Sequence, residues 1–302
     1  VVTSAMSGVT NELIKKAVKI SKNFPNSERD VLLSTGEQMA SALIAGKLCD
    51  LGFNSRSWMS WQIPIITRGN YSAARIIKIG TDQLKRYLKK GGTPIITGFQ
   101  GLNKESRLTT LERGGSDASA IMLAKFFKAK RCIIYTDVDG VYTTDPNLTR
   151  KAKKIKALSY EEMLEMSSLG AKVMQPASIQ DAKLNKIKID VKSSFINKSG
   201  TQIIGRKKIR DINIIRGVSF TKNDAKVSLL GVKDKPGVAA AIFEPLYKNS
   251  INVDMVVQNI SSDGKETDLT FTIKSDDVLK TKRLVSRNKK IKIYRLKKNY
   301  GA

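Results

Sequence analysis

Short apolar runs alternate with amphipathic segments up to about residue 206. Five runs rich in β-branched or aromatic residues, bounded by polar or glycine-containing turns, predict strands at 1–4, 54–58, 94–99, 131–136 and 187–191. Segments 11–20 and 38–49 carry apolar residues at helical spacing, and a further helix is expected after Gly115. This alternation predicts an α/β domain with a mainly parallel open sheet sandwiched by helices.

The pattern changes after residue 206. Residues 201–210 are basic and aperiodic, so we place a boundary here between a first domain, 1–206, and a second, 207–302. The second domain predicts the order strand, helix, strand, strand, helix, strand at 226–232, 236–247, 252–257, 268–273, 276–286 and 291–296. This βαββαβ order is the ferredoxin-like plan.

The composition narrows the possible chemistry. The chain has 302 residues, no histidine and two cysteines, Cys49 and Cys132, each among apolar neighbours. The lack of histidine excludes histidine acid–base catalysis and the usual zinc sites, and we assign no metal-ligand set within the chain. No signal peptide or apolar run of roughly 18 residues is present, and the isolated cysteines suggest buried thiols in a reducing compartment. We therefore expect a cytoplasmic protein with no membrane partner.

The formal net charge of +27 suggests a polyanionic partner when it is taken alone. The excess is mostly lysine spread along the whole chain, however, and no aromatic residues that could stack on bases cluster beside it. We therefore favour solvated lysine-rich faces and expect no nucleic-acid partner.

Residues 113–117, Arg-Gly-Gly-Ser-Asp, are the sharpest chemical feature. A glycine turn that leads into a helix presents backbone N–H groups to an anion, and an adjacent guanidinium can bind a carboxylate bidentately. The structural alternative is a tight turn in which Ser116 or Asp117 caps the helix. Arg113 favours the functional interpretation, with a small molecule that carries a carboxylate or phosphate.

Two other segments allow both structural and functional interpretations. Ser34 and Glu37 have the spacing of a capping box, in which Glu37 would only satisfy a backbone amide. Residues 136–146 follow a buried strand and so lie where open α/β sheets bind ligands. Their acidic spacing does not fit a calcium loop, which favours a nucleotide or its magnesium. Because the chain has no G-x-x-x-x-G-K-[ST] loop and no protein-kinase motif set, ATP chemistry here requires another phosphate-binding loop.

The motifs, in their order along the chain, resemble those of the aspartokinase branch of the amino-acid kinase family. The matching segments are SAMSGVTNELI from Ser4, LSTGEQ from Leu33, GFQG from Gly98, RGGSD from Arg113, YTDVDGVYTTDP from Tyr135 and EEMLEMSSLGAKV from Glu161. The second domain resembles the ACT regulatory module in its LGVKDKPG and NVDMVVQN segments. Together the resemblance covers nearly the whole chain.

The resemblance implies transfer of the ATP γ-phosphoryl group to the β-carboxylate of L-aspartate, giving 4-phospho-L-aspartate for lysine, threonine and methionine biosynthesis. ATP with Mg²⁺ would be the cofactor. Lysine, threonine or both would be feedback effectors acting on the ACT domain. Pairing of ACT modules would produce a homo-oligomer.

The same resemblance implies roles for individual residues. Arg113 would bind the α-carboxylate of aspartate and Glu37 its α-ammonium, in a pocket also formed by Ser4, Thr10, Gly114, Gly115, Ser116 and Asp117. Lys172 and Asp137 would be catalytic, and the nucleotide would contact Thr136, Asp137, Tyr142, Thr143, Thr144, Asp145, Pro146, Asn147, Ala171 and Lys172. The effector would bind Asp234, Lys235, Pro236, Gly237, Asp254, Gln258 and Asn259, where the alternative is an ordinary turn and a half-buried strand.

Several departures from the family pattern lead to further expectations. The family's N-terminal K-F-G-G segment, whose lysine supports the transferred phosphoryl group, does not occur, so we expect a truncated N-terminus and impaired turnover. One ACT module is present where the family usually has two, so we expect a truncated C-terminus as well. Glu112 replaces a usual glycine, and Asn147 replaces an arginine that commonly contacts the nucleotide.

Three alternatives stay open at this point. A sister kinase would act on glutamate, N-acetylglutamate, carbamate or UMP, although Glu37 with Arg113 favours a free amino acid. A noncatalytic amino-acid sensor would bind ligands without turnover. A nucleic-acid binder would show steeply salt-dependent binding that no nucleotide competes with.

Overall fold

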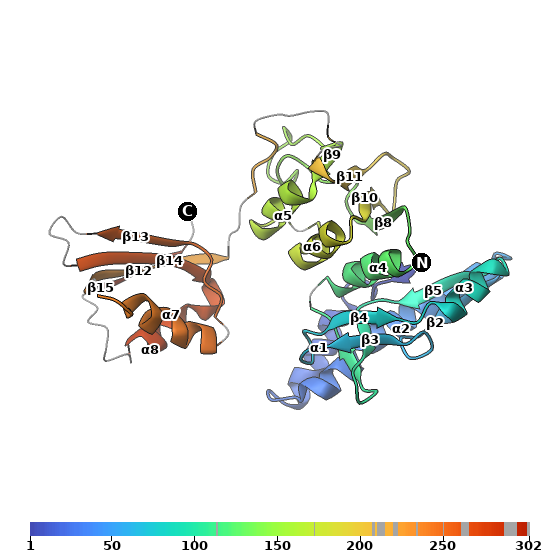
Figure 1. Ribbon diagram of the computed structural model, residues 1–302, viewed down its shortest axis with the longest axis horizontal. Helices are drawn as coiled ribbons and strands as arrows, with labels where there is room; N and C mark the ends of the chain where they lie inside the picture. The colour runs from blue at the N-terminus through green and yellow to red at the C-terminus, as the bar shows by residue number, and fades with distance from the viewer. Residues whose placement is uncertain are drawn as a thin grey trace. The chain divides into compact units, whose positions relative to one another are not determined.

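The computed structural model describes residues 1–112, 114–171, 173–206, 209, 215–219, 223–233, 235–249, 251–260, 266–286 and 295–300. The chain forms two compact units, Val1–Ser219 and Phe220–Ala302 (Figure 1). In the described part of the chain, no helix has both the length and the apolar composition needed to span a bilayer.

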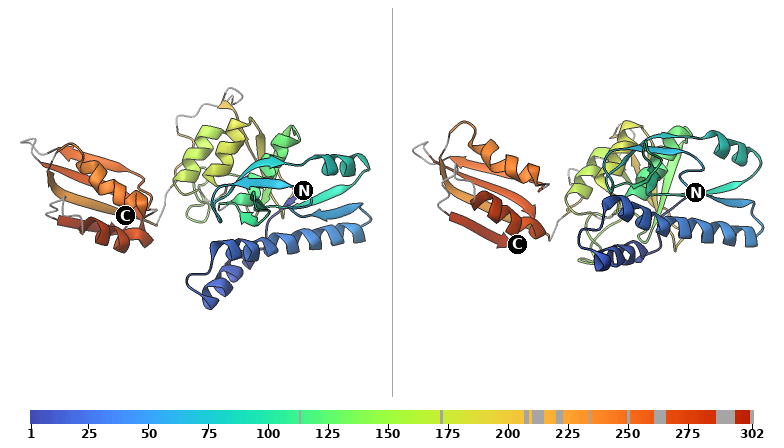
Figure 2. Two further views of the ribbon diagram at one scale, coloured as in Figure 1. Left: turned by 60° about the horizontal axis from the view of Figure 1, so that its bottom comes forward. Right: turned by 90° about the horizontal axis from the view of Figure 1, so that it is seen from below.

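A parallel sheet and the longest described helix form one part of the first unit. In the sheet order β1-β5-β2, the central strand β5 (Thr93–Thr97) pairs in parallel with β1 (Val2–Thr3) and with β2 (Ser55–Trp58). The helix α2 (Asn26–Asp50) follows α1 (Val9–Ile20), and both are prominent in Figure 2. Because β1 and β5 run in parallel, the segments that follow them leave the sheet at the same edge.

A second, mixed sheet has the order β4-β3-β6-β7. Its strands are β3 (Ile65–Arg68), β4 (Arg75–Ile79), β6 (Gln100–Leu102) and β7 (Leu108–Thr110). A buried cluster that includes Ile63, Ile65, Leu84 and Leu111 joins this sheet to α3 (Asp82–Lys89) and to the following helix, α4 (Gly115–Phe126). This sheet therefore holds the chain on both sides of the glycine pair at 114–115.

A third sheet, β8-β10-β11-β9, carries the remaining strands of the first unit. The strand β8 (Arg131–Thr136) pairs in parallel with β10 (Lys188–Ser193) over six residue pairs. The other strands are β9 (Ala157–Ser159) and β11 (Thr201–Ile204), and the helices packed with this sheet are α4, α5 (Tyr160–Ser168) and α6 (Pro176–Leu184). Its core includes Ile121, Leu158, Met163 and Ile189, which are fully buried.

The second unit is a four-stranded antiparallel sheet, β13-β14-β12-β15, with helices on one face (Figure 1). The strands are β12 (Asp224–Lys233), β13 (Val256–Ile260), β14 (Glu266–Lys274) and β15 (Arg295–Tyr300), and the helices are α7 (Val238–Lys248) and α8 (Val278–Ser286). Leu269, Phe271 and Ile273 point into the core, because alternate residues of a strand face the same side of the sheet. The βαββαβ order is confirmed.

The predicted class is also confirmed in the first unit, since five of its strand pairings are parallel and three antiparallel among the described residues. The sequence patterns did not reveal the short strands β3, β4, β6, β7, β9 and β11. Two local interpretations were wrong. Cys49 is exposed near the end of α2 rather than buried, and Ser34 does not cap a helix, because α2 already begins at Asn26.

Candidate active site

Glu37 is a buried acid in the middle of α2. Only 3% of its surface is exposed, and its Oε1 accepts a hydrogen bond of 3.1 Å from the backbone N–H of Ala5, just beyond β1. Its Oε2 is buried and has no partner among the described residues. Burial raises the pKa of Glu37 to about 7. The side chain is therefore placed to accept a cation in a dry site.

Glycine 36 makes this approach possible. A Cβ at Gly36 would lie 2.9 Å from the Cβ of Ala5 and 3.4 Å from Val9, so a larger residue would force α2 away from the segment after β1. That segment carries Ser4, which is exposed, and leads into Thr10, which is half-buried in the first turn of α1. Ser4, Thr10 and Glu37 are thus placed on adjoining segments.

The Gly98-Phe99-Gln100 turn joins three elements at the same edge. A Cβ at Gly98 would lie 2.7 Å from the carbonyl oxygen of Thr3 and 3.0 Å from the Cβ of Ser116. Phe99 has a φ of 66°, a left-handed conformation rare for a non-glycine residue. The hydroxyl of Ser119 on α4 accepts a hydrogen bond of 3.1 Å from the backbone N–H of Phe99. The turn therefore brings the end of β1 against the first turn of α4.

Gln100 links this turn to α2. Its side-chain amide donates to the carbonyl of Ser34 at 3.1 Å, and its Oε1 accepts from Gln38 at 3.2 Å. Gln100 is fully buried, and sequence reasoning did not single it out as part of the site. Its only signal was its place in the GFQG motif.

The helix α4 begins at the glycine pair. Gly114 adopts a left-handed conformation with φ 78°, and α4 starts at Gly115 with Ser116 and Asp117 in its first turn. Burial raises the pKa of Asp117 to about 6. A helix start has unpaired N–H groups and a partial positive charge, which favour an anion. Arg113 lies outside the described residues.

A second set of polar side chains follows β8. The hydroxyl of Thr136 donates to the exposed carboxylate of Asp137 at 3.0 Å. Tyr142 donates to Asp139 at 2.7 Å, and this bond, with Lys154 at 3.0 Å, holds the pKa of Asp139 below its ordinary value. Asp139, which the sequence did not assign to the site, thereby fixes the Tyr142 ring.

The rest of this loop is a series of exposed turns. The Thr143 hydroxyl accepts from the N–H of Lys153 at 3.1 Å, and the Asp145 carboxylate accepts from the N–H of Asn147 at 2.8 Å. Thr144 is half-buried, whereas Asp145, Pro146 and Asn147 are exposed. In the described ranges, no three His, Cys, Asp or Glu side chains gather as a metal-binding group.

Gln175 connects the glycine pair to the segment that contains Ala171. A Cβ at Gly114 would lie 2.2 Å from the Cγ of Gln175, and Ser178 of α6 donates to the carbonyl of Gly114 at 3.3 Å. Ala171 is half-buried, and its N–H donates to the carbonyl of Met166 at 2.8 Å. Lys172 lies outside the described residues. Gln175 was missed, because only the following proline marked it as a helix start.

The predicted effector residues are exposed in the second unit. Lys235, Pro236 and Gly237 form the turn before α7, where Gly237 has a φ of 89°. Asp254 precedes β13, and Gln258 and Asn259 lie on β13, an edge strand of the sheet. Asp234 lies outside the described residues.

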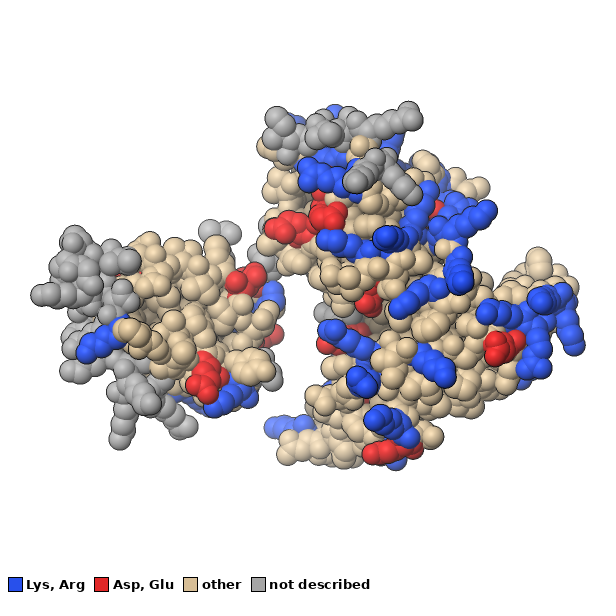
Figure 3. All heavy atoms as spheres, viewed as in Figure 1, with Lys and Arg blue, Asp and Glu red and all other residues tan. Residues whose placement is uncertain are grey.

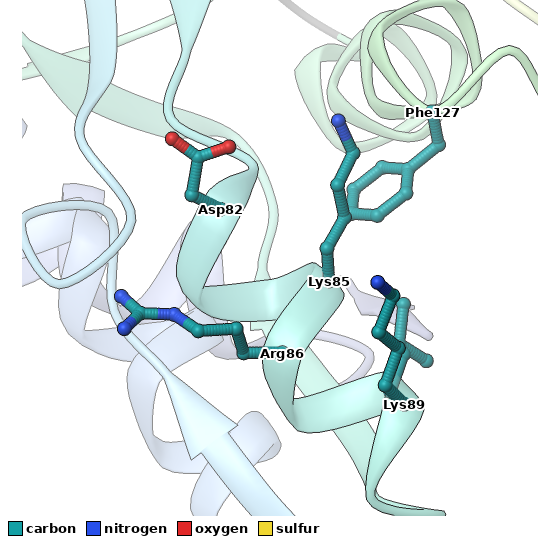
Figure 4. A pocket seen from close by; sticks show the side chains of 6 residues that line it. Asp82, Lys85, Arg86, Lys89 and Phe127 are labelled. Atoms are coloured by element: carbon teal, nitrogen blue, oxygen red, sulfur yellow. The ribbon is translucent and has the colours of Figure 1, made fainter.

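A separate open hollow of about 440 Å³ lies beside α3. It is lined by Asp82, Lys85, Arg86, Leu88, Lys89 and Phe127 (Figure 4). None of these is a predicted site residue. The face shown in Figure 3 carries Lys and Arg over many elements of the first unit rather than in one stripe.

Comparisons with known proteins agree with this arrangement. A profile of the amino acid kinase family matches residues 1–193, and an ACT domain profile matches residues 227–288. An aspartokinase of Bacillus sp. (strain MGA3) is 39% identical over 97% of this chain and 71% of that protein.

Solved structures give the same result. E. coli aspartokinase III in complex with aspartate and ADP (R-state) matches with a TM-score of 0.77 at 26% identity, over 96% of this chain and 66% of that chain. The same enzyme in complex with lysine and aspartate (T-state) matches with a TM-score of 0.74 at 26% identity, over the same shares.

The first unit is an α/β domain in which a glycine pair precedes α4, and the second is a ferredoxin-like ACT domain. Together they define a small-molecule kinase with a regulatory module. More particularly, the chain belongs to the aspartokinases of the amino acid kinase family.

Proposed function

We propose that this kinase transfers the γ-phosphoryl group of ATP to the β-carboxylate of L-aspartate, giving 4-phospho-L-aspartate in the cytoplasm. The observation that carries the proposal is Glu37, a buried acid whose Oε2 has no partner among the described residues and whose Oε1 binds Ala5 just beyond β1. A free amino acid carries an ammonium and a carboxylate, which are the two charges that would complement such a pocket. Its ammonium would pair with Glu37, and its carboxylate would meet Arg113 and the helix start.

The aspartate side chain then has a defined direction. With its α-groups held between Glu37 and α4, its β-carboxylate would be directed toward the proposed pocket residues Ser4, Thr10 and Ser116, which follow β1 or begin α4. Holding the acceptor in one orientation is a large part of catalysis in phosphoryl transfer, because little covalent chemistry is asked of the protein.

The nucleotide would bind against the segment that follows β8. Thr136 ends β8, which pairs in parallel with β10, and Asp137 follows it directly, at the usual ligand-binding edge of such sheets. Residues 142–147 would line the nucleotide, and Ala171 and Lys172 would approach its phosphates. Lys172 would neutralise charge that develops on the transferred group.

Magnesium fits the chemistry of this set. The Asp137 carboxylate is exposed at the strand end, and oxygen ligands suit Mg²⁺, which is usually held by one or two carboxylates together with substrate phosphates. Bound Mg²⁺ would supply neutralisation of phosphate charge.

The ACT domain would make this reaction responsive to its end products. We propose that lysine, threonine or both bind at Lys235–Gly237 and Asp254–Asn259, between paired modules of a homo-oligomer. The support is the exposed turn before α7, the position of β13 at the edge of the sheet that the described residues form, and the lysine complex of the E. coli relative. The reaction product would feed lysine, threonine and methionine biosynthesis.

The test is an assay of aspartyl hydroxamate formation with MgATP, run on this chain and on a version carrying the family's K-F-G-G strand at its N-terminus. We expect aspartate-dependent product that increases with the added strand. Hydroxamate from glutamate or N-acetylglutamate but not from aspartate would instead establish a sister kinase. Binding of both ligands without product in either version would establish a sensor.

A further inference from the structure

Asp30 is a fully buried carboxylate in α2 that the proposed chemistry does not use. Its Oδ2 accepts hydrogen bonds from the backbone N–H groups of Ser72 at 2.8 Å and Thr110 at 2.7 Å. Its Oδ1 accepts from the hydroxyls of the same two residues, at 2.6 and 2.9 Å. One side chain thereby holds two separate segments at four points.

One of these segments leads to the glycine-rich helix start, and the other supports it. Thr110 ends β7 and stands three residues before Arg113. Ser72 lies in the connection between β3 and β4, in a left-handed conformation with φ 64°. This connection also supports β7, because the N–H of Ala74 donates to the carbonyl of Thr110 at 3.2 Å. The next residue, Leu111, is held by the carbonyl of Phe99 at 2.9 Å.

Asp30 and Glu37 share one rigid element. They are seven residues apart in α2, which is close to two helical turns, so both side chains leave nearly the same face about 10 Å apart. A bond from Asp30 to Thr110 therefore fixes the segment before Arg113 relative to Glu37. The distance between Glu37 and the segment before Arg113, which are proposed to bind the two ends of the amino acid, is therefore fixed by a residue of α2.

We propose that Asp30 is a positioning residue for the amino-acid pocket, which sets the separation between Glu37 and the Arg113 segment. This inference rests on the proposed function for the identity of the ligand. It predicts that aspartate binding depends on Asp30 while nucleotide binding does not, because the segment after β8 makes no contact with this network among the described bonds. A merely structural acid would affect both ligands through loss of folded protein.

The arrangement of donors around Asp30 means that asparagine can restore the hydrogen bonds without the charge. An asparagine oxygen can accept from the two backbone N–H groups, while its NH₂ group donates to the hydroxyl oxygens of Ser72 and Thr110, which also act as acceptors. Asp30→Asn thus retains all four links without the charge. Asp30→Ala loses all four and leaves two buried N–H groups unpaired.

The experiment is calorimetric titration of L-aspartate and, separately, of MgADP into the wild type and the variants. Since small displacements of binding groups have large effects, we expect Asp30→Ala to weaken aspartate binding by about tenfold or more and MgADP binding by less than about twofold. Asp30→Asn should return aspartate affinity to within about threefold of the wild type. Equal weakening of both ligands, or no rescue by asparagine, would overturn the proposal.

The matched control is a surface ion pair that also connects α2 to the β6–β7 hairpin. Glu28 on α2 pairs with Arg107 of the β6–β7 hairpin at 2.5 Å, but both side chains are about half exposed, at 53% and 44%. Such pairs contribute little, so Glu28→Gln should leave aspartate affinity unchanged. If it weakens binding as much as Asp30→Ala does, general attachment of the hairpin explains the effect and the proposal fails.

Two further measurements cover the case in which Asp30→Ala does not fold, and the second of them needs no ligand. Thr110→Val keeps the N–H bond to Asp30 but loses the hydroxyl bond, and we expect a threefold to fivefold weaker affinity for aspartate, about the effect of one hydrogen bond.

Hydrogen exchange of amides 108–112 is the measurement without a ligand. It should be unchanged in Asp30→Asn and faster in Asp30→Ala or, if that variant is unfolded, in Asp30→Ser. Unchanged exchange in the alanine or serine variant would overturn the proposal that Asp30 positions the segment before Arg113. Failure of wild-type protein to bind aspartate would refute only the proposed function.

Discussion

The two ends of the proposed active site are built in opposite ways. On the amino-acid side, Glu37 is buried and one of its oxygens has no partner among the described residues; burial raises the pKa of Glu37 to about 7 and that of Asp117 to about 6. On the nucleotide side, the carboxylates of Asp137 and Asp145 are exposed, and Asp139 has its pKa lowered by Tyr142 and Lys154.

This difference follows from the ligands proposed for each side. A small zwitterion can be recognised only by a few strong contacts, and charged contacts are strongest where water is excluded. The protein must therefore hold desolvated charges that only the ligand satisfies. A polyphosphate carries its own charge and metal, so a chain of turns with hydroxyls and exposed carboxylates is sufficient.

The largest expected effect tests the amino-acid side through Arg113. Arg113→Ala removes the proposed partner of the α-carboxylate, and we expect aspartate affinity to fall about 100-fold or more, while MgADP affinity changes less than about threefold. Calorimetry on both ligands measures this. The matched control is Arg86→Ala, in the open hollow beside α3, which should leave both affinities unchanged. Equal losses for both ligands with Arg113→Ala would contradict its assignment.

Glu37→Gln separates binding from stability on the same side. The raised pKa of Glu37 means that the folded state keeps a proton between about pH 4.5 and 7 that the unfolded state has lost, so stability decreases as pH rises through this window. Glutamine removes that cost, so the variant should be more stable than the wild type at pH 8, by roughly 1 to 3 kcal/mol, with the difference disappearing below about pH 4.5. Aspartate affinity should fall about 10-fold to 100-fold.

The measurement for Glu37→Gln is thermal unfolding followed by tryptophan fluorescence, together with aspartate titration. Both tryptophans, Trp58 and Trp61, lie in the first unit, so the signal reports on the domain that contains Glu37. A variant that is less stable at pH 8, or one that binds aspartate normally, would show that Glu37 is a structural acid.

Asp137→Asn tests the nucleotide side. It removes an exposed carboxylate at the end of β8, and we expect MgADP affinity to fall about tenfold while aspartate affinity stays within about twofold. Asp50→Asn, at the exposed end of α2, is the control and should change neither. If Asp137→Asn weakens aspartate binding more than MgADP binding, the division between the two sides is wrong.

The smallest effect is the pH dependence of aspartate binding. Because the ammonium of aspartate requires ionised Glu37, whose pKa is raised to about 7, affinity should increase by up to about tenfold between pH 6 and 8. MgADP affinity should change less over that interval. Titrations at four pH values would measure this, and the dependence should become weaker in Glu37→Gln. A flat profile for wild-type protein would contradict the role of Glu37.

Local patterns predicted most of the regular elements. The five predicted strands of the first domain correspond to β1, β2, β5, β8 and β10. The strands that escaped prediction are three to five residues long and partly polar, so they carry too little periodicity to be recognised. Ser34 and Glu37 had the spacing of a helix start, yet they lie inside a 25-residue helix, where Ser34 donates back to the carbonyl of Val31.

Local patterns along the chain were enough to predict the α/β class, the ferredoxin-like second domain and the glycine turn before Ser116, because these depend on local spacing and on glycine's access to left-handed backbone. Three features are visible only in the folded chain: Glu37 is buried, Gln100 joins α2 to the turn after β5, and Asp30 accepts hydrogen bonds from Thr110. Each of these depends on residues that are far apart in the chain, and burial and hydrogen bonding are properties of the packed arrangement rather than of any segment.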